Sequence, residues 1–321
     1  MFTLAIVSPC YNEEAVLERS AQRLSALLAQ LSAQGKVSPR SFILYVDDGS
    51  TDRTWVMIER LARENPQIRG ISLGANVGHQ YAIMAGMMTA KDRADAVVTI
   101  DADLQDDLEA LRRMVDEYEQ GYDIVYGVKT QRDADPAWKR LTAAAFYRMQ
   151  RSMGLKTINH HADFRLLSRR ALEQLSRYDE SNLYLRGLIP MLGYPSTTVA
   201  DEIRPREAGE SKYTMRKMLN LALDGITSMS TRPLHLIVYL GVAYLLVSFA
   251  VALYAAGRWL LGSGSVGSSE LMLLSLWFIG GSILVALGLV GLYVGKAFVE
   301  TKRRPRYNIV KETPEAQSLN G

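Results

Sequence analysis

The sequence predicts an α/β fold with a mostly parallel sheet, followed by an amphipathic segment and two membrane-spanning helices. Strand and helix patterns alternate along residues 1–128, and such alternation favours right-handed crossovers between parallel strands. Residues 233–257 and 271–295 are two stretches of 25 residues that contain no Asp, Glu, Lys or Arg. Because a helix needs roughly 20 apolar residues to cross a bilayer core, both stretches qualify.

The elements of the first domain follow from local patterns. Runs of apolar and β-branched residues predict strands at 2–7, 42–46, 68–73, 96–100 and 124–126. Helical periodicity predicts helices at 15–31, 52–63, 81–90 and 108–119. The third of these helices contains the small residues Ala82, Ala85 and Gly86, which indicate close packing of the helix on the sheet.

Composition narrows the class of protein. The net charge is +3 and 22% of the residues are charged, so we expect no nucleic-acid partner. The single cysteine, Cys10, excludes an intramolecular disulfide and fits a reducing compartment.

Basic residues flank the apolar stretches. Arg216, Lys217 and Arg232 precede the first, and Lys296 and the cluster at 302–306 follow the second. The positive-inside rule therefore places both termini on the cytoplasmic side of the plasma membrane. An apolar stripe before the first stretch favours a helix lying in the membrane interface, and the alternative is a helix that packs on the first domain or on another subunit.

These observations divide the chain into five parts. We expect a cytoplasmic domain at 1–210, an interfacial amphipathic segment at 211–232, spans at 233–257 and 271–295, and a basic tail at 296–321. Residues past 310 are expected to be disordered.

An acidic stretch follows the fourth predicted strand. Asp101, Asp103 and the side-chain oxygen of Gln105 are hard oxygen ligands, which suit Mg²⁺ or Mn²⁺. Ligands bind beyond the carboxyl ends of strands in open α/β sheets, and two carboxylates this close are costly to bury unless a cation joins them. The alternative is a helix start, where acidic residues complement the macrodipole. That alternative explains Asp106 and Asp107 but not Asp101.

The loops after the first three strands are expected at the same edge of the sheet. Tyr11 can pack against a base, and Asp48 can accept a hydrogen bond from a base or ribose. Gly49 permits a tight turn, and we interpret Asp52 as a helix cap. We interpret His79 as a loop or cap residue rather than a base.

Four motifs follow one another along this domain. They are Pro9-x-Tyr11-Asn12-Glu13, Asp47-Asp48-Gly49-Ser50-x-Asp52, Asn76-x-Gly78 and Asp101-Ala-Asp103-Leu-Gln105-Asp106. In this order they resemble family 2 glycosyltransferases, specifically the polyprenyl-phosphate branch of dolichol-phosphate mannose synthases and bacterial undecaprenyl-phosphate glycosyltransferases. The two apolar stretches match the bacterial two-helix subgroup. One departure is Asp107-Leu108, where the family usually has Pro-Pro.

The resemblance implies a Rossmann-like domain of the GT-A type that binds a nucleotide sugar. It implies that the nucleotide is held by Pro9, Tyr11, Glu13, Asp48, Asp101 and Lys129. It also implies that Mg²⁺ or Mn²⁺ is bound by Asp101, Asp103 and Gln105.

Further candidates for the acceptor and the chemistry come partly from a basic stretch at 129–148, which contains Arg132 and Arg140, and partly from the resemblance. Arg132, Arg140 and Lys212 are candidates for the acceptor phosphate, and Lys212 lies in a Gly-x-Ser-Lys loop that resembles a lid. The expected catalytic residues are Asp103, Asp163 and Lys212, and Asp163 lies in the motif Ala-Asp163-Phe-Arg-Leu, which resembles the family segment that carries the proposed catalytic aspartate. For Asp163 two roles stay open, general base or orienting group, because a phosphomonoester with a second pKa near ~6 is already largely anionic at neutral pH.

The implied activity is inverting transfer of one sugar from a nucleotide sugar, with UDP preferred, to a polyprenyl phosphate at the cytoplasmic membrane face. Alternatives are a GDP-mannose-dependent mannosyltransferase and a non-catalytic nucleotide-sugar-binding membrane scaffold. A processive polysaccharide synthase is disfavoured because the Gln-x-x-Arg-Trp stretch is missing from the sequence. Proteins that this chain resembles form tetramers, so we expect a homo-oligomer.

Overall fold

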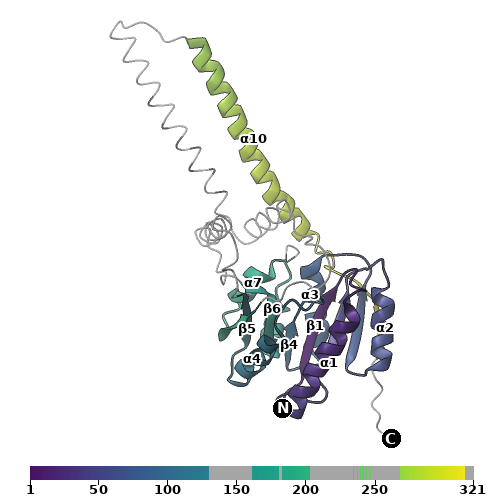
Figure 1. Cartoon of the computed structure of the whole chain (residues 1–321). Helices are drawn as coiled ribbons and strands as arrows, with labels where there is room; N and C mark the ends of the chain where they lie inside the picture. The colour runs from purple at the N-terminus through teal and green to yellow at the C-terminus, as the bar shows by residue number, and fades with distance from the viewer. Residues whose placement is uncertain are drawn as a thin grey trace.

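The computed structural model describes residues 1–129, 161–180, 183–202 and 268–314, together with single positions between 234 and 250. These residues form a mixed α/β domain from which one long helix projects (Figure 1). The predicted α/β class is confirmed. The expected interfacial segment at 211–232 lies outside the described residues.

One eight-stranded sheet forms the centre of the domain, in the order β7-β5-β6-β4-β1-β2-β3-β8. The strands are β1 (Leu4–Cys10), β2 (Phe42–Asp47), β3 (Ile68–Leu73), β4 (Ala96–Thr99), β5 (Ile124–Lys129), β6 (His161–Ser168), β7 (Ser196–Asp201) and β8 (Ile309–Glu312). The pairs β1–β2, β1–β4, β2–β3 and β5–β7 are parallel. All five predicted strands are therefore present, and they meet the parallel expectation where they pair with one another.

Strand β6 was not predicted, and its presence makes the sheet mixed rather than parallel throughout its centre. It lies between β4 and β5 and runs antiparallel to both. Its first residue, His161, pairs with Val128 near the end of β5, and Arg165 pairs with Thr99 at the end of β4. The beginning of β6 consequently lies at the carboxyl edge of the parallel strands.

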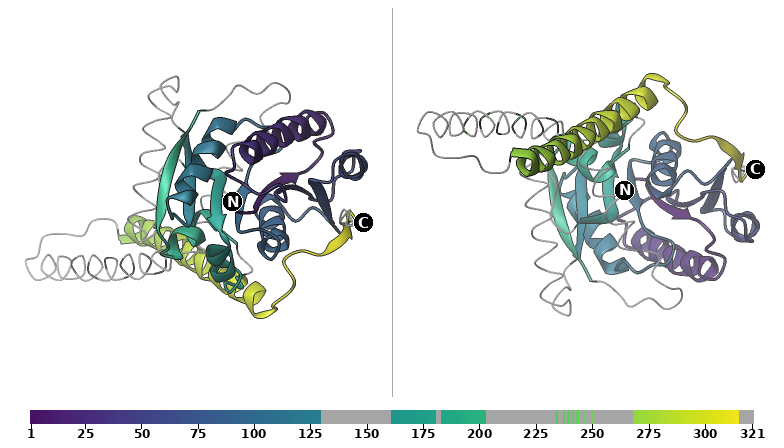
Figure 2. Two further views of the ribbon diagram at one scale, coloured as in Figure 1. Left: turned by 90° about the horizontal axis from the view of Figure 1, so that it is seen from below. Right: turned by 90° about the horizontal axis from the view of Figure 1, so that it is seen from above.

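Helices cover both faces of the sheet (Figure 2). On one face the apolar stripes of α1 (Leu17–Ala33), α2 (Thr54–Glu64) and α4 (Leu108–Glu119) share a core with the sheet. On the other face α3 (His79–Lys91), α6 (Arg169–Leu175) and α7 (Leu185–Met191) do the same. Each helix has apolar residues spaced three and four apart, which is the pattern that buries one face.

Helix α3 lies unusually close to the sheet at Gly86. A Cβ atom at this position would lie 2.3 Å from Val7 Cγ1 and 2.7 Å from Val46 Cγ2. Both distances are too short for a carbon–carbon contact, so a larger residue would push the helix away. The predicted packing role of the small residues in this helix is confirmed.

The C-terminal part contains helix α10 (Ser268–Thr301). Its segment Phe278–Thr301 has 24 residues and contains an 18-residue window with a mean hydropathy of 2.1, so it is long and apolar enough to cross a membrane. Apolar side chains such as Leu284 and Val285 are exposed along it. The span expected at 271–295 lies within this helix. The span expected at 233–257 lies outside the described residues, except for single positions that are helical.

The tail after α10 returns to the sheet. Strand β8 pairs antiparallel with β3, and Thr313 both donates its N–H to the Gly70 carbonyl and accepts from the Gly70 amide at 2.9 Å. Arg306 donates to the Tyr178 carbonyl at 2.6 Å. The expectation of disorder past 310 is therefore wrong for residues 311–314. An edge strand presents unpaired N–H and C=O groups, and the open edge of β3 supplies the partner that the tail's own composition did not reveal.

Candidate active site

The chemically active side chains gather at the carboxyl edge of the sheet. Asp101 follows β4, Lys129 ends β5, and Asp163 lies near the start of β6. The Thr99 hydroxyl donates to the Asp163 carbonyl, so the end of β4 is attached to the start of β6. Because β6 is antiparallel, it delivers Asp163 to the edge where the parallel strands deliver Asp101.

Asp101 and Asp103 lie in a tight turn. The Leu104 amide donates to the Asp101 carbonyl at 3.1 Å, and the Gln105 amide donates to Asp103 Oδ1 at 3.2 Å. Leu104 has a φ of 49°, a left-handed conformation that is uncommon for a residue with a side chain. Such strain is typical of functional sites, where the surrounding structure fixes the backbone.

The carboxylate of Asp101 is in an unfavourable electrostatic environment. Its pKa is raised, chiefly by desolvation and further by the neighbouring carboxylates Asp163 and Asp103, although His79 opposes the shift. Half of the side-chain surface is nevertheless open to solvent, with an exposed fraction of 50%. The carboxylates of Asp103, in the same turn, and of Asp163, in β6, crowd this position. A cation at this point would relieve the repulsion.

Asp106 is a buried member of the same cluster. Burial raises its pKa to about 8, and Asp101 contributes to the shift, whereas Lys129 opposes it. The Lys129 Nζ lies 3.5 Å from Asp106 Oδ1. The helix-start interpretation is confirmed for Asp107, whose Oδ1 accepts from the Glu109 amide at 3.1 Å. Asp106 instead faces the acidic turn.

Asp163 is held by two guanidinium groups. Arg165, which is fully buried, donates from Nη2 to Asp163 Oδ1. Arg186 donates from Nη2 to Asp163 Oδ2 at 3.0 Å and from Nε to Oδ1 at 3.3 Å. Burial alone would raise the pKa of Asp163, but Arg186 and Arg165 outweigh it and hold the pKa well below its usual range.

His79 lies between the two acidic groups. Its Nε2 is 3.5 Å from Asp101 Oδ1 and 3.7 Å from Asp163 Oδ2. His79 is the first residue of α3 and follows the N-cap residue Gly78, so it lies one position beyond the loop or cap position that we expected. Its imidazole also joins the centre, and that contact was not predicted. One side chain therefore spans the gap between Asp101 and Asp163.

The first two loops are fastened to each other. Asn12, with a φ of 55°, accepts through Oδ1 from the Thr51 amide at 2.8 Å and the Asp52 amide at 3.4 Å. The Glu13 amide donates to Thr54 Oγ1 at 2.9 Å. Asp52 Oδ1 accepts from the Thr54 amide at 2.9 Å, which confirms the predicted capping role of Asp52. The loops thus form one rigid rim.

Asp48 fastens the third loop to this rim. Its Oδ1 accepts from the Val77 amide at 2.8 Å and its Oδ2 accepts from the Gly78 amide at 3.0 Å. Gly49 has a φ of 67°, and a Cβ there would lie 2.6 Å from the backbone of Ala75, so the tight turn needs glycine. Asp48 therefore has a structural task, and its contact with a nucleotide stays a prediction.

The remaining residues predicted to hold the nucleotide also lie at this rim. Pro9 is buried within β1, whereas the Tyr11 side chain is exposed at the surface where a base could stack. Glu13 is half-buried beside them. Their roles stay predictions. Arg132, Arg140 and Lys212 lie outside the described residues.

The acidic turn suits a divalent cation by its chemistry. Among the described residues no group of three or more His, Cys, Asp or Glu side chains has the arrangement of a complete metal site. Mg²⁺ and Mn²⁺ sites in transferases often use one or two carboxylates, with waters and substrate phosphates as the other ligands. The crowded carboxylate of Asp101 and the neighbouring Asp103 fit that incomplete set.

Sequence reasoning missed Arg186 and the contact of Arg165 with Asp163. Arg186 lies in the short helix α7, outside every motif, so no local pattern marks it. Arg165 follows Asp163 by two residues in a strand, where side chains alternate between faces. An arginine at a fully buried strand position is rare without a partner, and that rarity is the signal that could have identified it.

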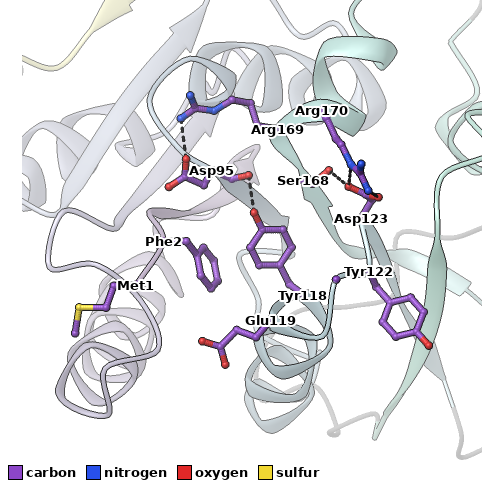
Figure 3. Close-up of a pocket in the computed structure, with 11 residues that line it drawn as sticks. Met1, Phe2, Asp95, Tyr118, Glu119, Tyr122, Asp123, Ser168, Arg169 and Arg170 are labelled. Carbon is purple, nitrogen blue, oxygen red and sulfur yellow. Dashed lines mark hydrogen bonds and ion pairs between the residues drawn. The ribbon is translucent and has the colours of Figure 1, made fainter.

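A cavity of about 640 Å³ lies at the opposite, amino edge of the sheet (Figure 3). Two ion pairs line it, Arg169 with Asp95 and Arg170 with Asp123. Tyr118 donates from its hydroxyl to the Asp95 carbonyl at 3.3 Å. None of the predicted site residues is in this cavity.

Known proteins are similar to this chain in sequence over nearly its whole length. The model of the glycosyl transferase family 2 matches residues 5–176. An uncharacterized glycosyltransferase, YkoT, from Bacillus subtilis is 44% identical over 95% of this chain and 90% of its own length. The bactoprenol glucosyl transferase of Shigella phage SfX is 36% identical over 95% of this chain and 98% of its own.

Among solved structures, a mannosyltransferase from Pyrobaculum calidifontis is 18% identical, with a TM-score of 0.41 over 93% of this chain and 85% of its own. The family model covers more than half of this chain, and the full-length relatives exceed 30% identity. This chain belongs to glycosyl transferase family 2.

Proposed function

We propose that this protein transfers a single sugar from a nucleotide sugar to a polyprenyl phosphate at the cytoplasmic face of the membrane. The supporting observation is the pairing, at one sheet edge, of an acidic turn with a carboxylate held by two arginines. The turn suits a metal-bound diphosphate, and the arginines suit a second anionic group. Relatives named bactoprenol glucosyl transferase support a polyprenyl acceptor.

The donor side of the proposed site follows the rim. Tyr11 stacks on the base, and Glu13, Asp48 and Pro9 shape the pocket for the nucleoside. Asp101, Asp103 and Gln105 hold Mg²⁺ or Mn²⁺, which when bound stabilises the negative charge of the departing diphosphate. Lys129 adds a fixed positive charge near the acidic turn.

The transfer step is a displacement with inversion. An oxygen of the acceptor phosphate attacks the anomeric carbon in line while the bond to the diphosphate breaks. UDP is the preferred nucleotide, and a GDP-mannose donor is the alternative. Lys212 closes over the phosphates as part of a lid.

The acceptor requires proximity to lipid. Helix α10 is long and apolar enough to anchor the domain, and basic residues follow it at 302–306. With a second span at 233–257, both termini lie in the cytoplasm. The proposed assembly is a homo-oligomer, a tetramer by resemblance, which native mass spectrometry in detergent would test.

Radiolabelled sugar transfer tests this proposal. Purified protein is incubated with undecaprenyl phosphate and, in turn, UDP-glucose, UDP-galactose, UDP-N-acetylglucosamine, UDP-4-formamido-arabinose and GDP-mannose. We expect a labelled lipid product with one UDP-sugar, loss of product with EDTA, and recovery with Mg²⁺ or Mn²⁺. Donor binding without any lipid product under every condition would indicate a non-catalytic scaffold and overturn the proposal.

A further inference from the structure

The surroundings of Asp163 differ on its two sides. Behind it lies Arg165, with an exposed fraction of 0%, and in front lies Arg186, with 31% of its side chain exposed. Asp163 itself is 11% exposed. The carboxylate thus joins an arginine enclosed in the sheet to an arginine that reaches solvent.

This arrangement is poorly suited to proton abstraction. A general base needs a free oxygen and a pKa near the working pH. Both oxygens of Asp163 accept hydrogen bonds from arginines, and these arginines hold its pKa below the usual aspartate range despite burial. A phosphomonoester acceptor, with its second pKa near ~6, brings an anionic oxygen of its own. No proton has to move for the displacement to proceed.

We propose that Asp163 is a positioning residue, and that the group it positions, Arg186, binds the phosphate of the acceptor. This inference rests on the proposed function and names the acceptor-binding residue of that site. In the transfer step a bond forms between a phosphate oxygen and the anomeric carbon. The bond from that carbon to the diphosphate breaks, and its electron pair leaves with the diphosphate.

The guanidinium of Arg186 is well placed for this task. His79 lies within 4 Å of both Asp101 and Asp163, so the acidic turn and the arginine pair flank one imidazole. A phosphate bound by Arg186 would therefore lie beside the donor site. Arginine suits phosphate because its planar fork presents several N–H donors in a fixed geometry.

The helix that carries Arg186 is firmly attached to the rest of the centre. Leu185 and Leu188 are fully buried in the core that α3 shares with the sheet. The Leu185 amide donates to Gln80 Oε1 at 2.9 Å, which joins α7 to the residue after His79. Helix α7 lies at the end of the domain nearest α10, the end from which a lipid-borne phosphate would arrive (Figure 1).

Steady-state kinetics of matched variants separate this role from general-base catalysis. The variants are Arg186→Gln, Arg186→Lys and Asp163→Asn, and the control is Arg170→Gln, an arginine paired with a carboxylate at the opposite edge. We measure kcat and KM for undecaprenyl phosphate, and the affinity for the nucleotide sugar by calorimetry without acceptor.

We expect Arg186→Gln to raise the acceptor KM by about 10- to 100-fold, the effect of a lost hydrogen bond to a charged group. Arg186→Lys should restore part of this affinity, and donor affinity should change less than about twofold. Asp163→Asn should have the same phenotype, and the double variant should be little worse than either single variant, because both changes disturb one unit. The control should match the wild type.

Other outcomes overturn the inference. An unchanged acceptor KM in Arg186→Gln removes the binding role. A loss of kcat in Asp163→Asn at unchanged KM identifies Asp163 as a base, provided that the loss in the double variant equals the product of the losses in the two single variants. If Asp163→Asn does not fold, the acceptor KM values of Arg186→Gln and Arg186→Lys decide whether Arg186 binds the acceptor phosphate.

Failure of the proposed function is recognised separately. If the wild type transfers no sugar, binding of undecaprenyl phosphate and of undecaprenol to the detergent-solubilised protein is compared in the presence of UDP. Phosphate-dependent binding that Arg186→Gln abolishes supports the inference without turnover. Binding that is equal in the wild type and in Arg186→Gln contradicts it.

Discussion

Both edges of the sheet carry arginine and aspartate side chains, but the balance of charge differs between them. At the amino edge, Arg169 pairs with Asp95 and Arg170 with Asp123, and neighbouring groups complete the hydrogen bonds. At the carboxyl edge, burial raises the pKa values of Asp101 and Asp106, and neighbouring acidic groups raise them further. The first edge is electrostatically balanced, whereas the second accumulates negative charge.

This difference indicates where function lies. Balanced ion pairs stabilise the fold, and they offer little favourable electrostatic interaction to a charged ligand. A crowded carboxylate cluster costs stability and is relieved when a cation binds. The cavity of about 640 Å³ lies at the balanced edge, away from the predicted site residues. Four predictions test this comparison.

The largest effect is expected at the carboxyl edge. Changing Asp103→Asn should lower transfer by about 100-fold or more, because it removes a proposed metal ligand. The thermal midpoint should stay unchanged or rise, since one like charge leaves the cluster. Enzyme assays beside thermal unfolding check both parts. Substantial loss of stability with activity retained per folded molecule would reverse the assignment of this edge.

The opposite pattern is expected at the amino edge. Asp123 is 4% exposed and accepts from Ser168 Oγ at 2.7 Å as well as from Arg170. Asp123→Ala should lower the free energy of unfolding by about 2 kcal/mol, a value reduced for the exposure of Arg170. Activity per folded molecule should be kept. Denaturant unfolding measures the first quantity, and a selective loss of kcat would show that this edge takes part in catalysis.

The third prediction concerns β8, the C-terminal strand that pairs with β3 and belongs to neither of the two edges compared above. Its expected effect is smaller than those at the edges. Thr313→Val removes the hydroxyl that accepts from the buried Gly70 amide. We expect the free energy of unfolding to fall by about 1–2 kcal/mol and the Gly70 amide to exchange its hydrogen faster. Thr313→Ser, which keeps the hydroxyl, is the control. Unchanged exchange in the valine variant would mean that the tail does not hold β3.

The smallest effect concerns Cys10, which lies at the end of β1 on the carboxyl edge. It is 1% exposed, and burial raises the pKa of its thiol, with further contributions from Glu13 and Asp47. A thiol reagent at pH 8 should therefore label the native protein far more slowly than the protein unfolded in guanidinium. Rapid native labelling would show that this part of the edge opens.

Local patterns predicted the parts of the molecule that depend on nearby residues. The first five strands and four helices, the packing of Gly86 and the cap formed by Asp52 all follow from short-range sequence. Strand β6 was missed because its paired residues are 33 to 43 positions away in β5 and 66 to 72 positions away in β4. Strand β8 was missed because its partner, β3, is more than 200 residues away.

The candidate site divides in the same way. Asp101 and Asp163 lie in recognisable motifs, and the structure brings them to one edge. Arg186 has no motif, and only tertiary structure places it beside Asp163. Asp106 was assigned to a helix start together with its neighbour Asp107. Both side chains are buried, and the sequence does not show that Asp107 accepts from a helix amide whereas Asp106 lies beside Lys129.

The most direct test compares the two edges in one assay of sugar transfer. Labelled lipid formed from undecaprenyl phosphate and the preferred nucleotide sugar is measured for the wild type, for Asp101→Ala combined with Asp103→Ala, and for Asp123→Ala. Our account predicts product from the wild type and from Asp123→Ala, and none from the double variant although it remains folded. Full transfer by the double variant would contradict the account.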